Sequence, residues 1–484
     1  MITAVILILY LVFTLVVGVA GYRLTRNTAD DYFLAGRSVG TVVLFFTLIA
    51  TNFSAFFFLG MAGESYRIGY SYYGIMAFGT ALVPLSFYFI GFKVWKLGRK
   101  RGYITPPEMI GDLFKSPALK VLFLVVMVQF TIPYLAIQPI GAGILLEQLT
   151  HGAIPFAWGA TLFTLLIVFY VSIGGMRSVA WTDVMQGVLM FTLMGLAVWI
   201  VGKALGGIAE ANAKIFALKP ELFGPRGAGD YFTPQRWFSY MLLWSFAVPM
   251  FPQMFMRFYI PGSVRALKTS TVLYPIVVAI LFVAPVLLGV LGRLAFPDLT
   301  GKEADNIVPM LLTSLAPEGL AALVMVGALA AMMSTMDSQL LALSSMLSRD
   351  LYVGFFNRAA SPSAQVRVGR ASVVLIAGVG LAIAFTRPGT IFEMATEAFT
   401  GLAILLPTTV AGLYWSRASG RACMASILVG EAMLVGYHYA WIPPEWAFGF
   451  LPFVPIMIVC AGIIVFASML SKRALSPSVK APTA

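Results

Sequence analysis

Residues 330–345, AAMMSTMDSQLLALSS, place an acidic side chain, Asp337, inside a long apolar stretch. A charge in the interior of a bilayer costs about 2.5–3.5 kcal/mol even on the more lenient insertion scales. Such a side chain needs a partner, and the hydroxyls beside it indicate which kind. Ser334, Thr335 and Ser338 surround Asp337, and hard cations prefer oxygen ligands of this type. The stretch therefore predicts a cation-coupled membrane transporter.

A second aspartate, Asp183, lies in the apolar stretch 178–191, SVAWTDVMQGVLMF. Two carboxylates that lie close together in a membrane would either hold a cation or share a proton. Because Asp183 follows Arg177 closely in the sequence, a solvated position near the start of a helix is the alternative for this residue.

The composition of the chain also predicts a membrane protein. Of its 484 residues, 60% are hydrophobic and 11% are charged, whereas soluble domains carry about 25% charged residues. A helix needs about 20 mostly apolar residues to cross a bilayer, and we expect an all-α polytopic protein with about 13 transmembrane helices. The expected spans are 2–21, 38–62, 72–92, 119–147, 153–174, 179–202, 237–256, 270–295, 318–345, 371–386, 391–415, 423–440 and 447–471.

The distribution of lysine and arginine predicts the orientation of these spans. Most of the 32 basic residues fall in alternate loops, and the loops rich in them face the cytoplasm. This places the N-terminus outside and the C-terminus inside, with Arg257, Arg265 and Lys268 in one inner loop. The same bias accounts for the net charge of +12, so no nucleic-acid partner is needed to explain it.

Two expected spans contain helix-breaking residues at corresponding places. The polar patch 50–54, ATNFS, interrupts the span 38–62, and Pro249 and Pro252 interrupt the span 237–256. Each interrupted span begins a block of five, and because five is odd the second block is inverted in the membrane. The expected division is a leading helix with an inner loop (1–37), a first repeat (38–202), an outer loop (203–236), a second repeat (237–415), two trailing helices (416–471) and a cytoplasmic tail (472–484).

Three motifs resemble the sodium:solute symporter family. They are DYFLAGRS at 31–38, GGMRSVAWTDVMQ at 174–186, and MSTMDSQ at 333–339, which is followed by RDLY at 349–352. The resemblance covers the chain from residue 1 to about 471. It implies a LeuT-type fold with a 5+5 inverted repeat, one extra leading helix and two trailing ones. Members of this family carry sugars, proline, pantothenate and monocarboxylates.

The resemblance also implies a sodium site between the first and eighth helices of the core. Its ligands would be the backbone carbonyls of Ala50, Phe53 and Ala331 and the hydroxyls of Ser334 and Thr335. The last three residues have the spacing of one helix face. Some relatives have a second sodium site that uses the aspartate corresponding to Asp183. Here Asp183, Ser334, Asp337 and Ser338 would form a second cation site or a protonatable one.

The family places its solute among the first, third, sixth, eighth and tenth core helices. The candidate residues on these spans are Asn52, Ser54, Gln129, Gln138, Trp244, Phe246, Gln253, Thr396 and Thr400. We expect no buried basic side chain among them. A carboxylate would therefore rely on helix amino termini and on sodium itself.

We therefore expect a secondary transporter rather than an enzyme, with sodium as its only metal. It would carry sodium together with a small organic acid or amino acid by alternating access. Its partners would be this solute and the lipid bilayer of the plasma (inner) membrane, which it crosses many times. Two alternatives remain open: a proton-coupled carrier of the same fold, with Asp183 or Asp337 as the acceptor, and a transporter-like sensor.

Overall fold

The computed structural model describes residues 2–23 and 28–470, and helices make up most of this part of the chain. The expected tail at 472–484 lies outside the described residues. Among the residues that are described, nine helices are long and apolar enough to cross a bilayer, or ten if one bent pair counts as a single span. The chain is therefore an all-helical, polytopic membrane protein, as the sequence predicts.

The helices follow one another without a sheet between them in the described part of the chain. They are α1 (Ile2–Arg23), α2 (Ala29–Leu34), α3 (Thr41–Asn52), α4 (Met61–Ile68), α5 (Ser71–Ser86), α6 (Phe92–Arg101), α7 (Pro106–Phe114), α8 (Pro117–Leu149), α9 (Phe156–Ala204), α10 (Ile208–Leu218), α11 (Pro234–Ala247), α12 (Pro252–Met256), α13 (Val264–Ala295), α14 (Ile307–Leu315), α15 (Glu318–Met346), α16 (Pro362–Thr386), α17 (Ile391–Ala403), α18 (Leu406–Tyr414), α19 (Gly420–His438) and α20 (Phe453–Leu470).

The difference between nine or ten long helices and the 13 expected spans has local causes. The 49 residues of α9 contain two expected spans, 153–174 and 179–202, which meet at Gly175. This glycine has φ 60° and ψ −157°, a conformation that is essentially restricted to glycine. In addition, α11 and α12 are each too short to cross a bilayer alone, and α19 is not among the nine.

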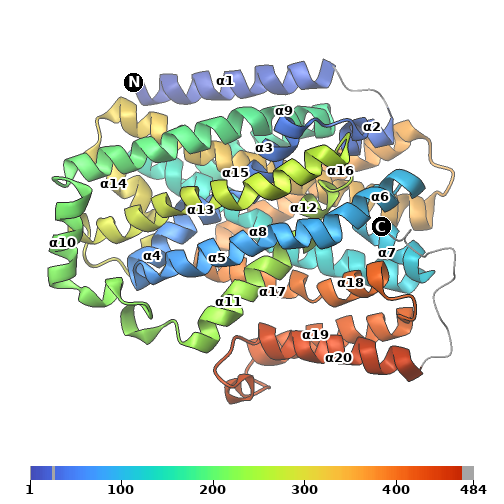
Figure 1. Ribbon diagram of the computed structural model, residues 1–484. Coiled ribbons are helices and arrows are strands. Elements are labelled where there is room, and N and C mark those ends of the chain that lie inside the picture. Colours follow the sequence, from blue (N-terminus) through green and yellow to red (C-terminus); the bar gives the residue numbers. More distant parts are fainter. Residues whose placement is uncertain (1, 24–27, 471–484) are drawn as a thin grey trace.

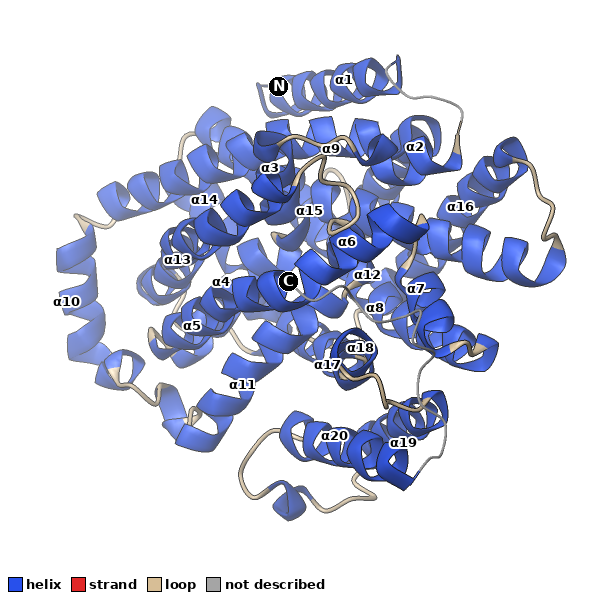
Figure 2. Ribbon diagram, turned by 45° about the vertical axis from the view of Figure 1, so that its right-hand side comes forward, coloured by secondary structure: helices blue, strands red, loops and turns tan. Residues whose placement is uncertain are grey.

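Helix α15 is the central element of the bundle. In its most apolar stretch, 83% of the residues are buried inside the protein, and it packs against α8, α9 and α16. Figures 1 and 2 show α1 along one side of the bundle and the pair α19–α20 along the opposite side. The polar residues of α15 are therefore held far from solvent.

Two of the family-like motifs meet where α2 contacts α9. The guanidinium of Arg177 makes a bidentate ion pair with the carboxylate of Asp31, with Nη2 2.6 Å and Nε 3.0 Å from Oδ1 and Nε 3.2 Å from Oδ2. A Cβ on Gly175 would lie only 2.6 Å from the carbonyl oxygen of Tyr32. The second motif thus needs its glycine for both the backbone turn and the close contact.

The first predicted break is present. Helix α3 ends at Asn52, Phe53 is extended (φ −92°, ψ 115°), and the chain resumes in a π-helical turn (Phe56–Gly60) and α4. The two halves are bent by 57°. Side chains satisfy the amides after the break, because the N–H of Ala55 bonds Gln138 Oε1 at 2.9 Å and the N–H of Phe56 bonds Ser54 Oγ at 3.1 Å. The carbonyls of Thr51 and Asn52, four residues earlier, thereby lose their helical partners.

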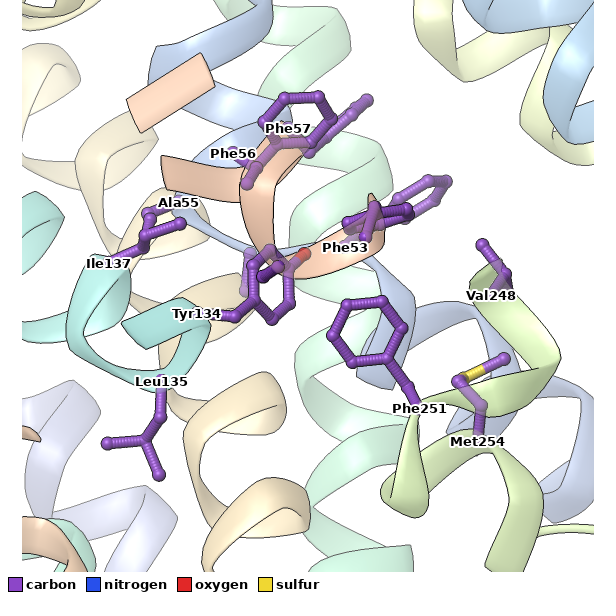
Figure 3. Close-up of a cluster of buried hydrophobic side chains, with 14 of the residues drawn as sticks. Phe53, Ala55, Phe56, Phe57, Tyr134, Leu135, Ile137, Val248, Phe251 and Met254 are labelled. Carbon is purple, nitrogen blue, oxygen red and sulfur yellow. The ribbon is translucent and has the colours of Figure 1, made fainter. Parts of the chain in front are cut away.

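The second predicted break is also present, at Pro249 and Pro252. Helix α11 ends at Ala247, a short 3₁₀ turn follows, and Phe251 is extended (φ −61°, ψ 130°) before α12 begins. Figure 3 shows Tyr134 of α8 beside both breaks, near Phe53 of the first and Phe251 of the second. The rings of Tyr134 and Phe251 have their centroids 4.9 Å apart.

Candidate functional site

The unwound end of α3 meets the hydroxyl-bearing face of α15. The hydroxyl of Thr335 donates to the carbonyl oxygen of Phe53 at 2.9 Å and lies 3.2 Å from that of Thr51. The other proposed sodium ligands, Ala50, Ala331 and Ser334, are fully buried on the same two helices. Neutral carbonyl and hydroxyl oxygens suit a monovalent cation that has to bind and later leave.

Asp183 lies within α9, eight residues beyond the turn at Gly175, and its side chain is fully buried. The alternative of a solvated helix start is therefore wrong. Its Oδ1 accepts a hydrogen bond from the hydroxyl of Ser334 at 2.5 Å, and its Oδ2 accepts one from the hydroxyl of Thr47 on α3. Because the Ser334 hydroxyl donates to Asp183, its oxygen lone pairs remain free to accept a cation.

Asp337 is also fully buried. The phenol of Tyr170 donates to its Oδ2 at 2.7 Å, and the hydroxyl of Ser338 lies 3.1 Å from its Oδ1. Ser338 in turn lies 3.1 Å from the hydroxyl of Thr51, beside the first break. The four residues predicted for a second cation site, Asp183, Ser334, Asp337 and Ser338, all lie in these buried contacts.

Arg257, which the sequence predicts to lie in an inner loop, is a central residue of the network that these contacts form. The structure buries this arginine completely, directly after α12, with Nη2 3.2 Å from Oδ2 of Asp183. The expectation of no buried basic side chain near the centre is therefore wrong. A signal was available, because Arg257 is the only charge in the apolar stretch 250–260, MFPQMFMRFYI, and follows the second break by one helical turn.

Between the two breaks lies a small cavity of about 20 Å³. Its polar lining is Asn52, Thr80, Tyr134 and Trp244, and aromatic and aliphatic side chains form the rest. Asn52 Nδ2 donates to the hydroxyl of Tyr274 at 2.7 Å, and the hydroxyls of Ser54 and Tyr134 lie 3.0 Å apart. The indole N–H of Trp244 is buried without a hydrogen-bond partner among the described residues.

The other candidate solute residues lie in four different places. Gln138 and Gln253 are buried beside the breaks, where the amide of Gln138 holds the N–H of Ala55. Thr396 and Thr400 line a separate cavity. Gln129 is exposed on α8, because it is five residues before Tyr134 and five residues turn a helix to a different face. Phe246 packs on Phe453 of α20, with ring centroids 6.3 Å apart.

The cavity at Thr396 and Thr400, which the predicted orientation would place on the outer side and which we call the outer cavity, measures about 610 Å³. Its ionisable lining comes from Glu64 and Arg67 of α4, Glu393 and Glu397 of α17, and His438 of α19. Aromatic rings separate it from the central cavity: Trp244 lies 4.6 Å from Phe399 and 5.5 Å from Phe56, measured between centroids. The central cavity is therefore closed on this side by side chains alone.

Comparisons with known proteins give the same fold and assign a family. The chain is 31% identical to the sodium/pantothenate symporter of Escherichia coli over 466 residues (94% of this chain, 93% of the relative). It is 28% identical to the osmoregulated proline transporter OpuE of Bacillus subtilis (98% and 95%). A solved structure of a Na⁺-coupled sialic acid symporter in a substrate-bound, outward-open state superposes with a TM-score of 0.84 at 20% identity, covering 98% of each chain.

The fold is thus LeuT-like, and the model of the sodium:solute symporter family matches residues 32–430. This match spans both breaks, α15, the second and third motifs quoted above, and the first motif from Tyr32 onward. The chain therefore belongs to the sodium:solute symporter family, and it is a multi-pass membrane transporter that couples a solute to sodium, not an enzyme.

Proposed function

We propose that this protein takes up a small organic acid or amino acid together with sodium by alternating access. One observation carries the proposal: the Phe53 carbonyl at the first break faces the Thr335 hydroxyl at 2.9 Å, beside a small cavity with polar groups. An ion bound here would touch both a broken helix and the central helix. Its arrival would favour one arrangement of the two and thereby prepare the cavity for solute.

In this proposal the sodium ligands are the carbonyls of Ala50, Phe53 and Ala331 and the hydroxyls of Ser334 and Thr335. The bound ion ties α3 to α15. The affinity gained by the solute when sodium is bound equals the affinity gained by sodium when the solute is bound. The membrane potential adds about 2.3 kcal/mol per positive charge for each 100 mV. Sodium is the coupling ion and travels with the solute.

The solute class rests on the relatives and on the central cavity. The names of two relatives specify pantothenate and proline, and both of these solutes carry a carboxylate. In this chain the amide of Asn52, the hydroxyl of Tyr134 and the free indole N–H of Trp244 would orient such a solute, while Phe56 and Phe399 would shield it from water. Arg257 is paired to Asp183, so in this proposal its charge does not bind the carboxylate of the solute.

We further propose the finer topology that the sequence predicts. It has 13 spans, the N-terminus outside, the C-terminus inside, and two inverted repeats at 38–202 and 237–415 between a leading helix and two trailing ones, in the plasma (inner) membrane. The positions of the two broken helices, at the start of each block, support this division. So does the turn at Gly175, which divides α9 between two spans.

Uptake into proteoliposomes tests this function. We expect the purified protein to accumulate one member of a panel of amino acids and small carboxylic acids under an inward sodium gradient at fixed pH. Ser334→Ala with Thr335→Ala should raise the sodium concentration for half-maximal uptake by more than tenfold. The control is Ser344→Ala, a buried hydroxyl of the same helix that bonds the carbonyl of Leu341. Unchanged sodium dependence in the double variant would contradict the sodium site.

A proton-coupled carrier is the second candidate. The observation that favours it is the buried network, in which Ser338 connects Asp337 to Arg257 and Asp183. Two carboxylates in one buried network can exchange a proton as the sites open. Accumulation driven by a proton gradient in sodium-free buffer would support this candidate over sodium coupling.

A further inference from the structure

Arg257 places a positively charged side chain in the interior of the protein. Its guanidinium is fully buried, with Nη2 2.5 Å from Ser338 Oγ and 3.2 Å from Asp183 Oδ2. Nε lies 3.2 Å from Thr47 Oγ1, and Nη1 lies 3.3 Å from the carbonyl oxygen of Gln253. The arginine therefore connects the second broken helix to α3, α9 and α15. Arginine is buried in this way only where its charge is paired and its donors are used.

The guanidinium occupies the place that the sequence predicts for a second cation. Two of the four residues of that predicted site, Asp183 and Ser338, direct their oxygens at Arg257. A sodium ion needs the same oxygens, and its positive charge would be repelled by the guanidinium. The side chain of Arg257 thus already supplies a positive charge at this position.

The charges of the buried network support the same view. Asp183, Asp337 and Arg257 are each fully buried, and when both aspartates are ionised they sum to one negative charge. The proposed sodium site adjoins this network through Ser334, whose hydroxyl lies 2.5 Å from Asp183 Oδ1. One sodium ion brings the sum to zero, whereas two would leave a net positive charge away from water, which is unfavourable.

We propose that Arg257 is a resident cation that replaces a second sodium ion, so that this protein binds one sodium ion per transport cycle. This inference rests on the sodium site of the proposed function. It makes Arg257 a positioning residue: it holds Asp183, and Asp183 holds Ser334 at the ion. It also fixes the energy available for uptake, because one sodium ion moves down its gradient for each solute.

The number of sodium ions bound per chain tests the proposal directly. Equilibrium binding of radioactive sodium to the purified full-length protein, without solute, should give one ion per chain. In Arg257→Gln the network is left with two uncompensated carboxylates, and we expect two ions per chain. The matched control is Arg265→Gln, an exposed arginine just beyond the second break, which should remain at one.

Further variants keep the test decisive if Arg257→Gln does not fold. Asp337→Asn alone balances the network without sodium and should weaken sodium binding by more than tenfold. The double variant Arg257→Gln with Asp337→Asn leaves only Asp183 charged and should return to one tightly bound ion. Arg257→Lys keeps the charge and should also bind one.

The outcomes separate this inference from the function on which it rests. Two ions bound to the unaltered protein would overturn the resident-cation role while leaving sodium coupling intact. A folded Arg257→Gln protein that binds one ion with unaltered affinity, or none, would overturn it as well. Failure of the unaltered protein to bind any sodium would instead overturn the sodium site of the proposed function.

Discussion

The indole nitrogen of Trp244 illustrates how much a single residue can decide in this protein. Its N–H is buried without a partner among the described residues, and Trp244 lines the central cavity. An unsatisfied buried donor is costly, and a solute oxygen would relieve that cost. In the proposed mechanism, Trp244 therefore binds the solute and does not bind the sodium ion.

Replacing this residue should separate solute binding from sodium binding. Trp244→Phe keeps an aromatic ring and removes the donor, and we expect the KM for solute to rise by about threefold to tenfold, the value of one lost hydrogen bond. Radioactive sodium binding should not change. Trp199→Phe is the control, because Trp199 is exposed at the bundle surface. An unaltered solute KM in Trp244→Phe would remove Trp244 from the site.

Asp305 lies outside the membrane-spanning helices, in the short helical turn Gly301–Asn306, and is 2% exposed. Its Oδ2 accepts the N–H of Ile391, the first residue of α17, at 2.9 Å. Burial raises the pKa of Asp305 to about 7, although the Ile391 N–H and the charge of Arg67 act in the opposite direction. This carboxyl joins an outer loop to the helix that lines the outer cavity.

The raised pKa gives a stability that depends on pH. Between about pH 4 and pH 7 the folded protein binds more protons at Asp305 than the unfolded chain does, so stability falls as the pH rises through this interval and levels off above it. Asp305→Asn cannot ionise, and it should flatten the decline in melting temperature between pH 5 and pH 8. Asp298→Asn, at an exposed position nearby, should retain the wild-type profile. If both variants showed the same slope, Asp305 would not be its source.

At the scale of single residues, the site residues that could be predicted from the sequence are those that differ chemically from their immediate neighbours in the chain. Asp183, Ser334, Thr335 and Asp337 stand out because polar groups are rare in apolar stretches, and the structure brings them together. Tyr134 was missed, because a tyrosine in a span has no such signal until its neighbours are known. Arg257 was misassigned because a charge near the end of a span is most often in a loop.

At the scale of elements, both broken helices could be predicted because their causes are local. Proline and short polar side chains disfavour helix whatever surrounds them. The number of spans was harder to predict, because hydropathy cannot decide whether a turn such as Gly175 ends one span or bends a single helix. That decision depends on contacts with α2, which lies far away in the sequence.

Gly175 should therefore be a sensitive point of α9. Gly175→Ala would place a Cβ 2.6 Å from the carbonyl oxygen of Tyr32 and strain the backbone at φ 60°. We expect the free energy of unfolding to fall by about 1–3 kcal/mol, seen as a lower melting temperature in detergent. Gly195→Ala is the matched control on the same helix, where nothing lies within 4 Å of the added Cβ. Equal melting temperatures for the two variants would contradict the close contact.

At the scale of the whole molecule, the sizes and positions of the cavities describe the conformational state of the transporter. The outer cavity is large, the central cavity is small, and the rings of Phe56, Trp244 and Phe399 lie between them. Elsewhere, ion pairs between distant segments, such as Lys120 with Asp350 at 3.0 Å and Glu108 with Arg349 at 3.0 Å, hold the helices together. A further cavity of about 500 Å³, lined by Glu108, Lys120 and Arg358, lies beside these ion pairs. The small central cavity therefore contrasts with two large cavities elsewhere in the protein.

Cysteine labelling tests both this arrangement and the orientation. The two native cysteines, Cys423 and Cys460, are buried, so background labelling should be low. Thr396→Cys places a thiol in the outer cavity, whereas Arg358→Cys places one on an exposed loop at the other end of α16. In intact cells, a membrane-impermeant maleimide should label Thr396→Cys and should label Arg358→Cys only after permeabilisation. Sodium in place of choline should speed the labelling of Thr396→Cys, because the bound ion favours the outward-facing arrangement. The reverse pattern of labelling would invert the predicted orientation and place the outer cavity toward the cytoplasm.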